Sequence, residues 1–266
     1  MLSVSRLVPA VEGLANYGNP FQIALRRLFT HGGEMTIVDR KTGVSVAAMR
    51  RSYHIFGETW YQHDYDVVGC PMRRGDVVVD VGANQGFFTC YAACQGAQVF
   101  AFEPNPKAFG FLRRNIMSNG FADRVTAECA AIADFERETD LFCSSYMDGG
   151  TDTINQQRGE SIVSIVGEQS RVPVKVTRLA SRIPADINIR LLKLDCEGAE
   201  LAILNDLKNS DRIDSMAIEY HDAAYKTEAL IETILGLGTH QVYALRGHIV
   251  HAIRTDILLE YARNLH

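Results

Sequence analysis

The segment DVGANQG, residues 80–86, decides the fold, because it follows the run Val77–Val79 and precedes a stretch over 86–95 that suits a helix. A continuous β-branched run is typical of a parallel strand covered on both faces. Glycines between a strand and a helix let the backbone turn sharply and approach a ligand with no Cβ in the way. The spacing GxNxG differs from the GxGxxG of dinucleotide enzymes and from the GxxxxGK[ST] of phosphate-binding loops, which argues against NAD and ATP. A tight turn without any ligand is the alternative interpretation.

Predicted strands and helices alternate on the C-terminal side of this segment. Asn105 and Pro106 are typical of the N-cap and first turn of a helix. Further strands are predicted over 98–102, 124–132, 187–194 and 213–220, helices around 201–207 and 230–235, and a closing hairpin about Arg246 and Gly247. This alternation predicts an α/β fold, with a mostly parallel sheet, right-handed crossovers and an antiparallel C-terminal hairpin.

Two regions depart from this regular pattern. Residues 1–70 predict a small N-terminal α+β cap, with a short amphipathic helix at 21–28 and a hairpin over 35–48. We expect this cap on the substrate side and one larger domain over 71–266. The polar segment 143–172 is longer than an ordinary connection, so we expect an insertion that is either mobile or a lid over the substrate.

Charged residues end the predicted strands. Glu103 follows the second strand, where a carboxylate can accept both hydroxyl hydrogens of a ribose. Lys193, Asp195 and Glu197 close the apolar strand and point to one side, and burying such charges without partners is costly. Glu219 and His221 end the next strand. The structural alternatives are that Glu103 only favours the next helix's positive end and that a lysine–carboxylate pair only orders the strand end.

Composition limits the classes of partner. The chain has 266 residues, a formal charge of −5 and 47% apolar residues, so no basic field favours nucleic acid or an anionic membrane. The six cysteines contain no CxxC pair. No apolar run approaches the roughly 20 residues that span a bilayer, and no secretory h-region is present, so we expect a cytoplasmic protein.

Three blocks of this sequence resemble a known family. DVGANQGFFT, AFEPNP with the later Asn115, and LLKLDCEGAE are similar to the blocks of FkbM-family methyltransferases, over roughly residues 75–255. The resemblance implies a class I, Rossmann-like methyltransferase that uses S-adenosylmethionine (SAM), releases S-adenosylhomocysteine (SAH), and usually methylates oxygen in sugars, polyketides or related natural products. It also implies that Ala131 lies near the adenine. The sequence departs from the family at Ala180, where an aspartate is common.

The residues and the resemblance together give a site hypothesis. We expect Asp80, Gly82, Asn84 and Gly86 to hold the methionine half of SAM and Glu103 the ribose. The remaining predicted cofactor-binding residues are Ala83, Phe87, Pro104, Asn105, Ala131 and Asp195. The predicted catalytic residues are Asp195, Glu197, Lys193, His221 and Glu219, with His221 or Glu219 as the base that removes the acceptor's proton and His54 as a weaker rival.

Several alternatives stay open at this point. Methyl transfer to nitrogen or to a carboxylate, and a non-catalytic SAM-binding module, compete with O-methylation. A dehydrogenase is disfavoured by the missing third glycine, and a nucleic-acid methyltransferase by the acidic charge. A divalent metal held by Asp195, Glu219 and a small-molecule substrate is possible but not favoured. The acceptor and the oligomeric state, including a homodimer, are not decided by the sequence, nor is the role of Tyr17, Tyr53, Trp60 and Tyr61 in a pocket or in packing.

Overall fold

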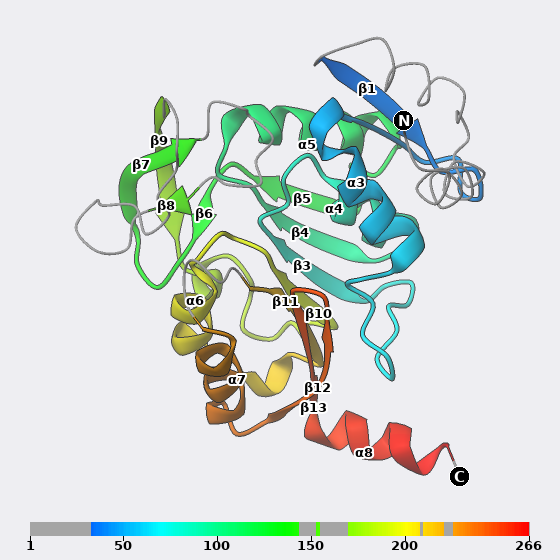
Figure 1. Cartoon of the computed structure of the whole chain (residues 1–266), viewed down its shortest axis with the longest axis vertical. Helices are drawn as coiled ribbons and strands as arrows, with labels where there is room; N and C mark the ends of the chain where they lie inside the picture. The colour runs from blue at the N-terminus through cyan, green and yellow to red at the C-terminus, as the bar shows by residue number, and fades with distance from the viewer. Residues whose placement is uncertain (1–32, 144–152, 155–169, 208–209, 221–225, 266) are drawn as a thin grey trace, which may run out of the picture.

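The computed structural model describes residues 33–143, 153–154, 170–207, 210–220 and 226–265 (Figure 1). The helix predicted at 21–28 and most of the predicted lid at 143–172 lie outside these residues, as does His221. The described part has a central sheet with helices on both faces. The mixed α/β fold with a mostly parallel sheet is therefore confirmed.

The central sheet has the strand order β12-β13-β11-β10-β3-β4-β5. Its parallel strands are β3 (Val77–Val81), β4 (Gln98–Phe102), β5 (Val125–Glu128), β10 (Leu191–Leu194) and β11 (Ser215–Glu219). The chain runs outward from β3 to β5 and then returns to β10 on the other side of β3. The carboxyl ends of β3 and β10 therefore flank the point where the strand order reverses, which is where ligands bind in open α/β sheets.

An antiparallel hairpin closes the sheet, as predicted. It consists of β12 (His240–Arg246) and β13 (Ile249–Arg254), and β13 pairs antiparallel with β11. A C-terminal helix that the sequence analysis did not predict, α8 (Thr255–Arg263), extends away from the end of β13 (Figure 1).

Alternate residues of the strands fill two cores. On β3, Val78 packs in one apolar cluster, while Val79 and Val81 pack in the other. The first cluster lies under α4 (Phe87–Cys94) and α5 (Pro106–Ser118), and the second lies under α6 (Glu200–Asp206) and α7 (Thr227–Gly236) (Figure 1). This two-sided burial leaves β3 and β10 with no solvent-exposed face.

Helix α5 begins where the sequence predicts. Asn105 adopts an extended backbone, and its side chain accepts hydrogen bonds from the backbone N–H groups of Lys107 and Ala108. Pro106 occupies the first turn, where the missing N–H costs nothing.

The N-terminal segment forms the predicted hairpin, β1 (Glu34–Val38) with β2 (Ser45–Met49). The aromatic stretch that shows no period in the sequence is helical, with a 3-10 turn at Arg50–Ser52, α3 (Tyr53–Gly57) and a π-helical turn at Glu58–Gln62. This helical stretch packs beside α4 (Figure 1).

The third predicted strand was wrong in extent. The expected strand over 124–132 is divided, since β5 ends at Glu128 and β6 (Ala131–Ile132) leaves the central sheet to pair with β9 (Ser170–Thr177). Periodicity shows that a run is strand-like but not which strand it pairs with, so the change of sheet is invisible in the sequence.

The irregular stretch after this strand also contains strands that the sequence analysis did not predict. β7 (Arg137–Cys143) pairs antiparallel with β9 and with the short β8 (Thr153–Ile154), which gives a second sheet of order β6-β9-β7-β8. Short turns complete the described fold at Leu179–Ser181 and Ser210–Arg212.

Candidate active site

The loop after β3 makes a very close approach to the neighbouring strand. Gly82 has a φ of +77°, and a Cβ built on it would lie 1.7 Å from the backbone oxygen of Asp195. Gly86 has a φ of +88°, and its Cβ would lie 2.8 Å from Leu112 Cδ1. Both positions favour glycine for conformation, and Gly82 needs it for space as well, because its close neighbour is backbone. The loop therefore lies directly against the chain that leaves β10.

Glu103 ties this loop to the end of β4. The buried carboxylate accepts hydrogen bonds from the backbone N–H of Asn84 through Oε2 (2.7 Å) and from that of Asn105 through Oε1 (2.8 Å). Two backbone donors fix the orientation of the carboxylate, and such bonds to an ionised group are among the stronger ones. The acid and the glycine loop thus form one unit at the carboxyl edge.

A buried ion pair supports the same edge from below. Lys193 Nζ lies 3.0 Å from Asp80 Oδ1 and 3.5 Å from Asp195 Oδ2, and it donates to the Gly82 oxygen (3.0 Å). Thr89 donates to Asp80 Oδ2 (2.6 Å). Burial would lower the pKa of Lys193, but Asp80 and Asp195 outweigh it, so the pKa is raised and the side chain stays charged.

A cavity of about 350 Å³ opens above these groups. Strand ends supply Val81, Phe102 and Glu219, and the loops supply most of the rest. The other described lining residues are His54, Ile55, Glu58, Tyr65, Gly82, Asn84, Glu103, Pro104, Ala130, Ala131, Ile132, Asp195, Cys196, Glu197 and Ala199.

The structure brings most of the predicted site residues together around this cavity. Those that line it are Gly82, Asn84, Glu103, Pro104, Ala131, Asp195, Glu197 and Glu219. Those that lie beside it without lining it are Asp80, Ala83, Gly86, Phe87, Asn105 and Lys193. Asp80 and Lys193 are instead paired in the support below the loop. The predicted base His221 is outside the described residues.

Part of the lining is not predicted from the sequence. Tyr65 and Glu58 are not among the predicted site residues, and His54 is only the weaker rival for the base. His54 and Glu58 are four residues apart on a helical stretch, so they share one face, and both line the cavity. The four-residue spacing is visible in the sequence, but the helix that places these two residues on one face was not predicted.

Glu58 lies in a negative field. Burial raises its pKa above the ordinary value, and Asp64 and Asp195 raise it further, against the opposing effect of His54. A carboxyl group with a raised pKa is closer to the range in which it can exchange a proton near neutral pH.

The N-terminal hairpin supports the glycine loop through amide side chains. Asn115 on α5 donates to the backbone oxygens of Ala47 (2.8 Å) and Gln85 (2.8 Å), and it accepts from the Ala47 N–H (2.8 Å). Gln85 accepts from the Met49 N–H (2.6 Å) and donates to the Ser52 hydroxyl (2.8 Å). Asn115, which belongs to the family resemblance, therefore joins the loop to the hairpin.

The turn after β10 is held by its own acid. Glu200 accepts from the backbone N–H groups of Cys196 (2.9 Å) and Gly198 (3.0 Å). Glu197 has a φ of +56°, which is unusual for a residue with a Cβ and is often seen at functional sites. Burial, followed by Glu200 and Asp195, raises the pKa of Cys196 well above its ordinary value, so this thiol stays protonated.

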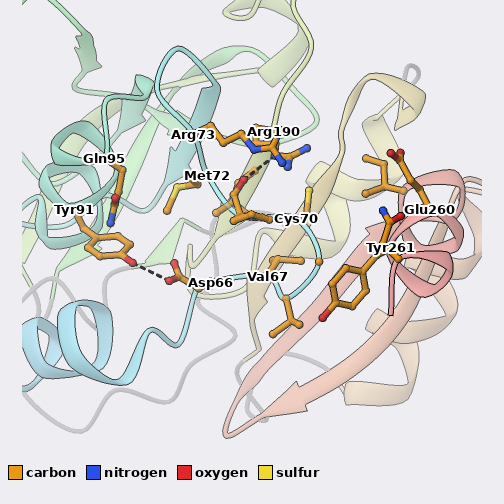
Figure 2. A pocket seen from close by; sticks show the side chains of 16 residues that line it. Asp66, Val67, Cys70, Met72, Arg73, Tyr91, Gln95, Arg190, Glu260 and Tyr261 are labelled. Atoms are coloured by element: carbon orange, nitrogen blue, oxygen red, sulfur yellow. Dashed lines mark hydrogen bonds between the residues drawn. The ribbon is translucent and has the colours of Figure 1, made fainter. Parts of the chain in front are cut away.

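A second and larger cavity, of about 710 Å³, lies at the amino edge of the sheet, where the parallel strands begin, and is called the amino-edge cavity. Figure 2 shows it between the loop 66–73, the end of α4 and α8, with Arg190 at the start of β10. Tyr91 donates to Asp66 (2.8 Å) and Arg190 donates to the Pro71 oxygen (3.1 Å) within this lining. Arg190 also donates to Asp214 (3.1 Å). Gly69 is the one glycine among the described lining residues.

The described residues contain no helix long and apolar enough to cross a membrane. They also contain no group of three histidine, cysteine, aspartate or glutamate side chains arranged to hold a metal ion.

A family model and curated relatives match the sequence of this chain. Residues 80–245 match the family model described as the methyltransferase FkbM domain. The 31-O-demethyl-FK506 methyltransferase FkbM of Streptomyces tacrolimicus is 30% identical over 68% of this chain and 74% of its own length. Methyltransferase 1 of Beauveria bassiana is 29% identical over 64% of this chain and 73% of its own.

A solved structure is similar in fold. The crystal structure of methyltransferase FkbM from Methylobacillus flagellatus KT has a TM-score of 0.50 and 16% identity, and it covers 93% of this chain. The present chain spans 59% of that longer chain, less than two thirds of its length.

Proposed function

The chain belongs to the FkbM methyltransferase family, a family of SAM-dependent methyltransferases, and from that premise we propose that it methylates a hydroxyl group of a small metabolite such as a sugar or polyketide. The observation that carries the proposal is the carboxyl-edge cavity, where the glycine loop and Glu103 meet Asp195 and Glu219. The name of the Streptomyces relative refers to an oxygen of FK506, and this supports oxygen as the methylated atom here.

The residues of the cavity fit SAM. Its volume lies in the range of about 300–1,000 Å³ that is typical of small-ligand pockets. The side-chain oxygen of Asn84 is buried and has no hydrogen-bond partner among the described residues, so it has acceptor capacity for a ligand. A Cβ on Gly82 would clash with the backbone oxygen of Asp195. Only glycine therefore lets the loop backbone lie this close to Asp195 beside the cavity.

We assign the holding residues from this fit. Gly82 and Asn84 would hold the methionine half and Glu103 the ribose, because a carboxylate offers about four acceptor sites and can take the hydroxyls besides its backbone donors. Ala130, Ala131 and Ile132 would border the adenine. SAM, when bound, supplies a methyl group that is electrophilic because it is attached to a sulfonium.

The chain's own contribution is then orientation and proton removal. A hydroxyl acceptor must lose its proton as the new O–C bond forms and the C–S bond breaks. Glu219 and Asp195 lie at the strand ends that face the cavity, and His54 with Glu58 faces it from the helical segment. Glu219 stays our proposed proton acceptor, and His221 stays a prediction from the sequence. Holding the two reactants in line can contribute up to about 7–11 kcal/mol.

Calorimetric titration with SAM and SAH tests the cofactor assignment. Glu103→Gln removes the charge and one strong acceptor, so we expect affinity for both to fall about 10- to 100-fold, which corresponds to about 1.5–3 kcal/mol. Glu260→Gln, on the lining of the amino-edge cavity, is the matched control and should leave both affinities unchanged. Equal affinities for native protein and Glu103→Gln would reject the ribose assignment.

A labelled-methyl assay tests the acceptor atom. The protein is incubated with [methyl-13C]SAM and a panel of sugars and polyketides that carry free hydroxyls, amines or carboxylates. We expect the label in products whose 13C chemical shift is that of an O-methyl ether. Label found only on nitrogen or as methyl esters would contradict O-methylation while leaving the methyltransferase activity intact.

A further inference from the structure

Tyr65 is a buried tyrosine at the border between the N-terminal segment and the cavity. Its side chain is 5% exposed, and its ring lies edge-on to Phe88 at 5.3 Å between centroids. Lys193 Nζ lies 5.2 Å from the ring centroid. An ammonium ion over an aromatic face is attracted by it, so the ring position is fixed from two sides.

The Tyr65 hydroxyl bridges two strands of the site. It donates to Glu219 Oε2 at 2.7 Å, and it lies 3.5 Å from Asp195 Oδ2. Glu219 is the last residue of β11 and Asp195 follows β10, and both line the cavity. Two carboxylates so close to one donor repel each other, and a shared hydroxyl lowers the cost of keeping both charged.

The phenol itself stays protonated. Burial raises the pKa of Tyr65 well above its ordinary value, and the charges of Asp195 and Glu219 raise it further. A phenol that does not ionise cannot remove a proton from an acceptor. Its hydroxyl hydrogen is donated to Glu219, so we do not assign Tyr65 as the base.

We propose that Tyr65 is a positioning residue that orients Glu219 toward the acceptor and keeps it ionised there. The N-terminal segment thereby completes the site that the strand ends begin. The role given to Glu219 rests on the proposed function, whereas the coupling between Tyr65 and Glu219 is a property of the protein without any ligand.

Carboxyl and phenol NMR titrations of the ligand-free protein test the coupling. The protein carries 13Cδ-glutamate, and the Glu219 signal is identified by its absence in Glu219→Gln. In Tyr65→Phe the carboxylate loses its donor, so we expect the midpoint of the Glu219 signal to move to higher pH by about one unit or more. A packing role alone would lower stability without moving this midpoint.

Tyr91→Phe is the matched control. Tyr91 is also buried and also donates to a carboxylate, Asp66 (2.8 Å), but it lies on the amino-edge cavity. This variant loses the same kind of hydrogen bond, and we expect the Glu219 midpoint to stay at its native value. A shift of equal size in both variants would overturn the proposal.

A measurement on the native chain covers the case in which Tyr65→Phe does not fold. With 13Cζ-tyrosine, the Tyr65 signal should keep its protonated position at pH values where a free tyrosine, with a pKa of about 10, is half ionised. In Glu219→Gln the signal should move, because the acceptor has changed. A Tyr65 signal that titrates like a free tyrosine, or that ignores Glu219→Gln, contradicts the proposal.

The proposed function fails in a different measurement. If native protein binds neither SAM nor SAH in the calorimeter, the methyltransferase assignment of this cavity is wrong, whatever the NMR titrations give. If native protein binds SAH and the Glu219 midpoint is the same in Tyr65→Phe as in native protein, only the role of Tyr65 is wrong.

Discussion

The two edges of the central sheet each carry a cavity, and the two cavities differ in how their charges are used. At the amino edge, in the larger cavity of about 710 Å³, Arg190 donates to the Pro71 oxygen and Tyr91 donates to Asp66 (Figure 2). Arg190 also donates to Asp214. At the carboxyl edge, the smaller cavity of about 350 Å³ is lined by carboxylates from several strand ends. The chemistry is therefore concentrated where polar strand ends meet, and the larger volume is not a guide to the active site.

Gly82 and Gly75, one at each edge, show that the backbone differs as well. At the carboxyl edge, Gly82 touches the chain after β10 so closely that no other residue fits. At the amino edge, Gly75 also has a positive φ, of +88°, but nothing lies within 4 Å of its built Cβ. Gly75 is therefore needed for conformation alone, whereas Gly82 is needed for conformation and for close approach.

The largest expected effect is that of Gly82→Ala against Gly75→Ala. The first places a methyl group 1.7 Å from the Asp195 oxygen, so the backbone has to move, and we expect a loss of more than about 4 kcal/mol in the free energy of unfolding and no measurable SAH binding. The second has only its backbone strain, about 1–2 kcal/mol, and should bind SAH as native protein does. Urea unfolding and calorimetry measure both. Equal losses would show that the loop is not packed as described.

Lys193→Met against Arg190→Met is the next comparison. The Lys193 side chain is 4% exposed and that of Asp80 is 0%, so removing the ammonium leaves a buried carboxylate uncompensated, and we expect a loss of about 3–5 kcal/mol. The Arg190 side chain is 16% exposed. Its partner Asp76 is 27% exposed, and its buried partner Asp214 keeps Arg254, so the loss should be smaller, about 1–2 kcal/mol. Urea unfolding measures both losses. A larger loss for Arg190→Met than for Lys193→Met would contradict this comparison.

The pH dependence of the Lys193 contribution follows from its raised pKa. A group whose pKa is higher in the folded than in the unfolded state stabilises the fold fully at pH values below its unfolded pKa, which is about 10.4 for lysine. This stabilisation is lost only as the pH rises through the folded pKa. Between about pH 6 and pH 9, Lys193 is charged in both states. The loss in the free energy of unfolding caused by Lys193→Met should therefore not change through titration of the lysine in this pH range.

The sequence predicts the elements that local rules control. The N-cap at Asn105, the β-branched strand Val77–Val81 and the glycine loop each depend on a few adjacent residues, and the structure has them where the patterns place them. The grouping of Glu103, Asp195 and Glu219 also follows, because parallel strands end at the same edge.

The rest depends on partners that are distant in the chain. Tyr65 and Glu219 are 154 positions apart, and Asn115 and Ala47 are 68 apart, so no local pattern reveals either contact. The apolar pair Ala131–Ile132 looks like a continuation of β5, yet it pairs with β9 in another sheet. Asp80 is the register partner of Lys193 and pairs with it below the loop, a pairing that the sequence did not predict, while its contact with the cofactor stays a prediction.

The smallest expected effect belongs to α8 at the amino-edge cavity. The Tyr261 ring packs on Gly69, where a built Cβ would lie 3.0 Å from its Cδ1 atom, so Tyr261→Ala removes this contact and widens the cavity. We expect a loss of about 1–2 kcal/mol in stability and an unchanged affinity for SAH, because no residue of the carboxyl edge is touched. Leu259→Ala, at an exposed position of the same helix, should change stability by less than about 0.5 kcal/mol. If Tyr261→Ala weakened SAH binding more than about threefold, a threshold corresponding to about 0.7 kcal/mol, the two edges would be energetically coupled. The division of the sheet into a chemical edge and a structural edge would then not hold.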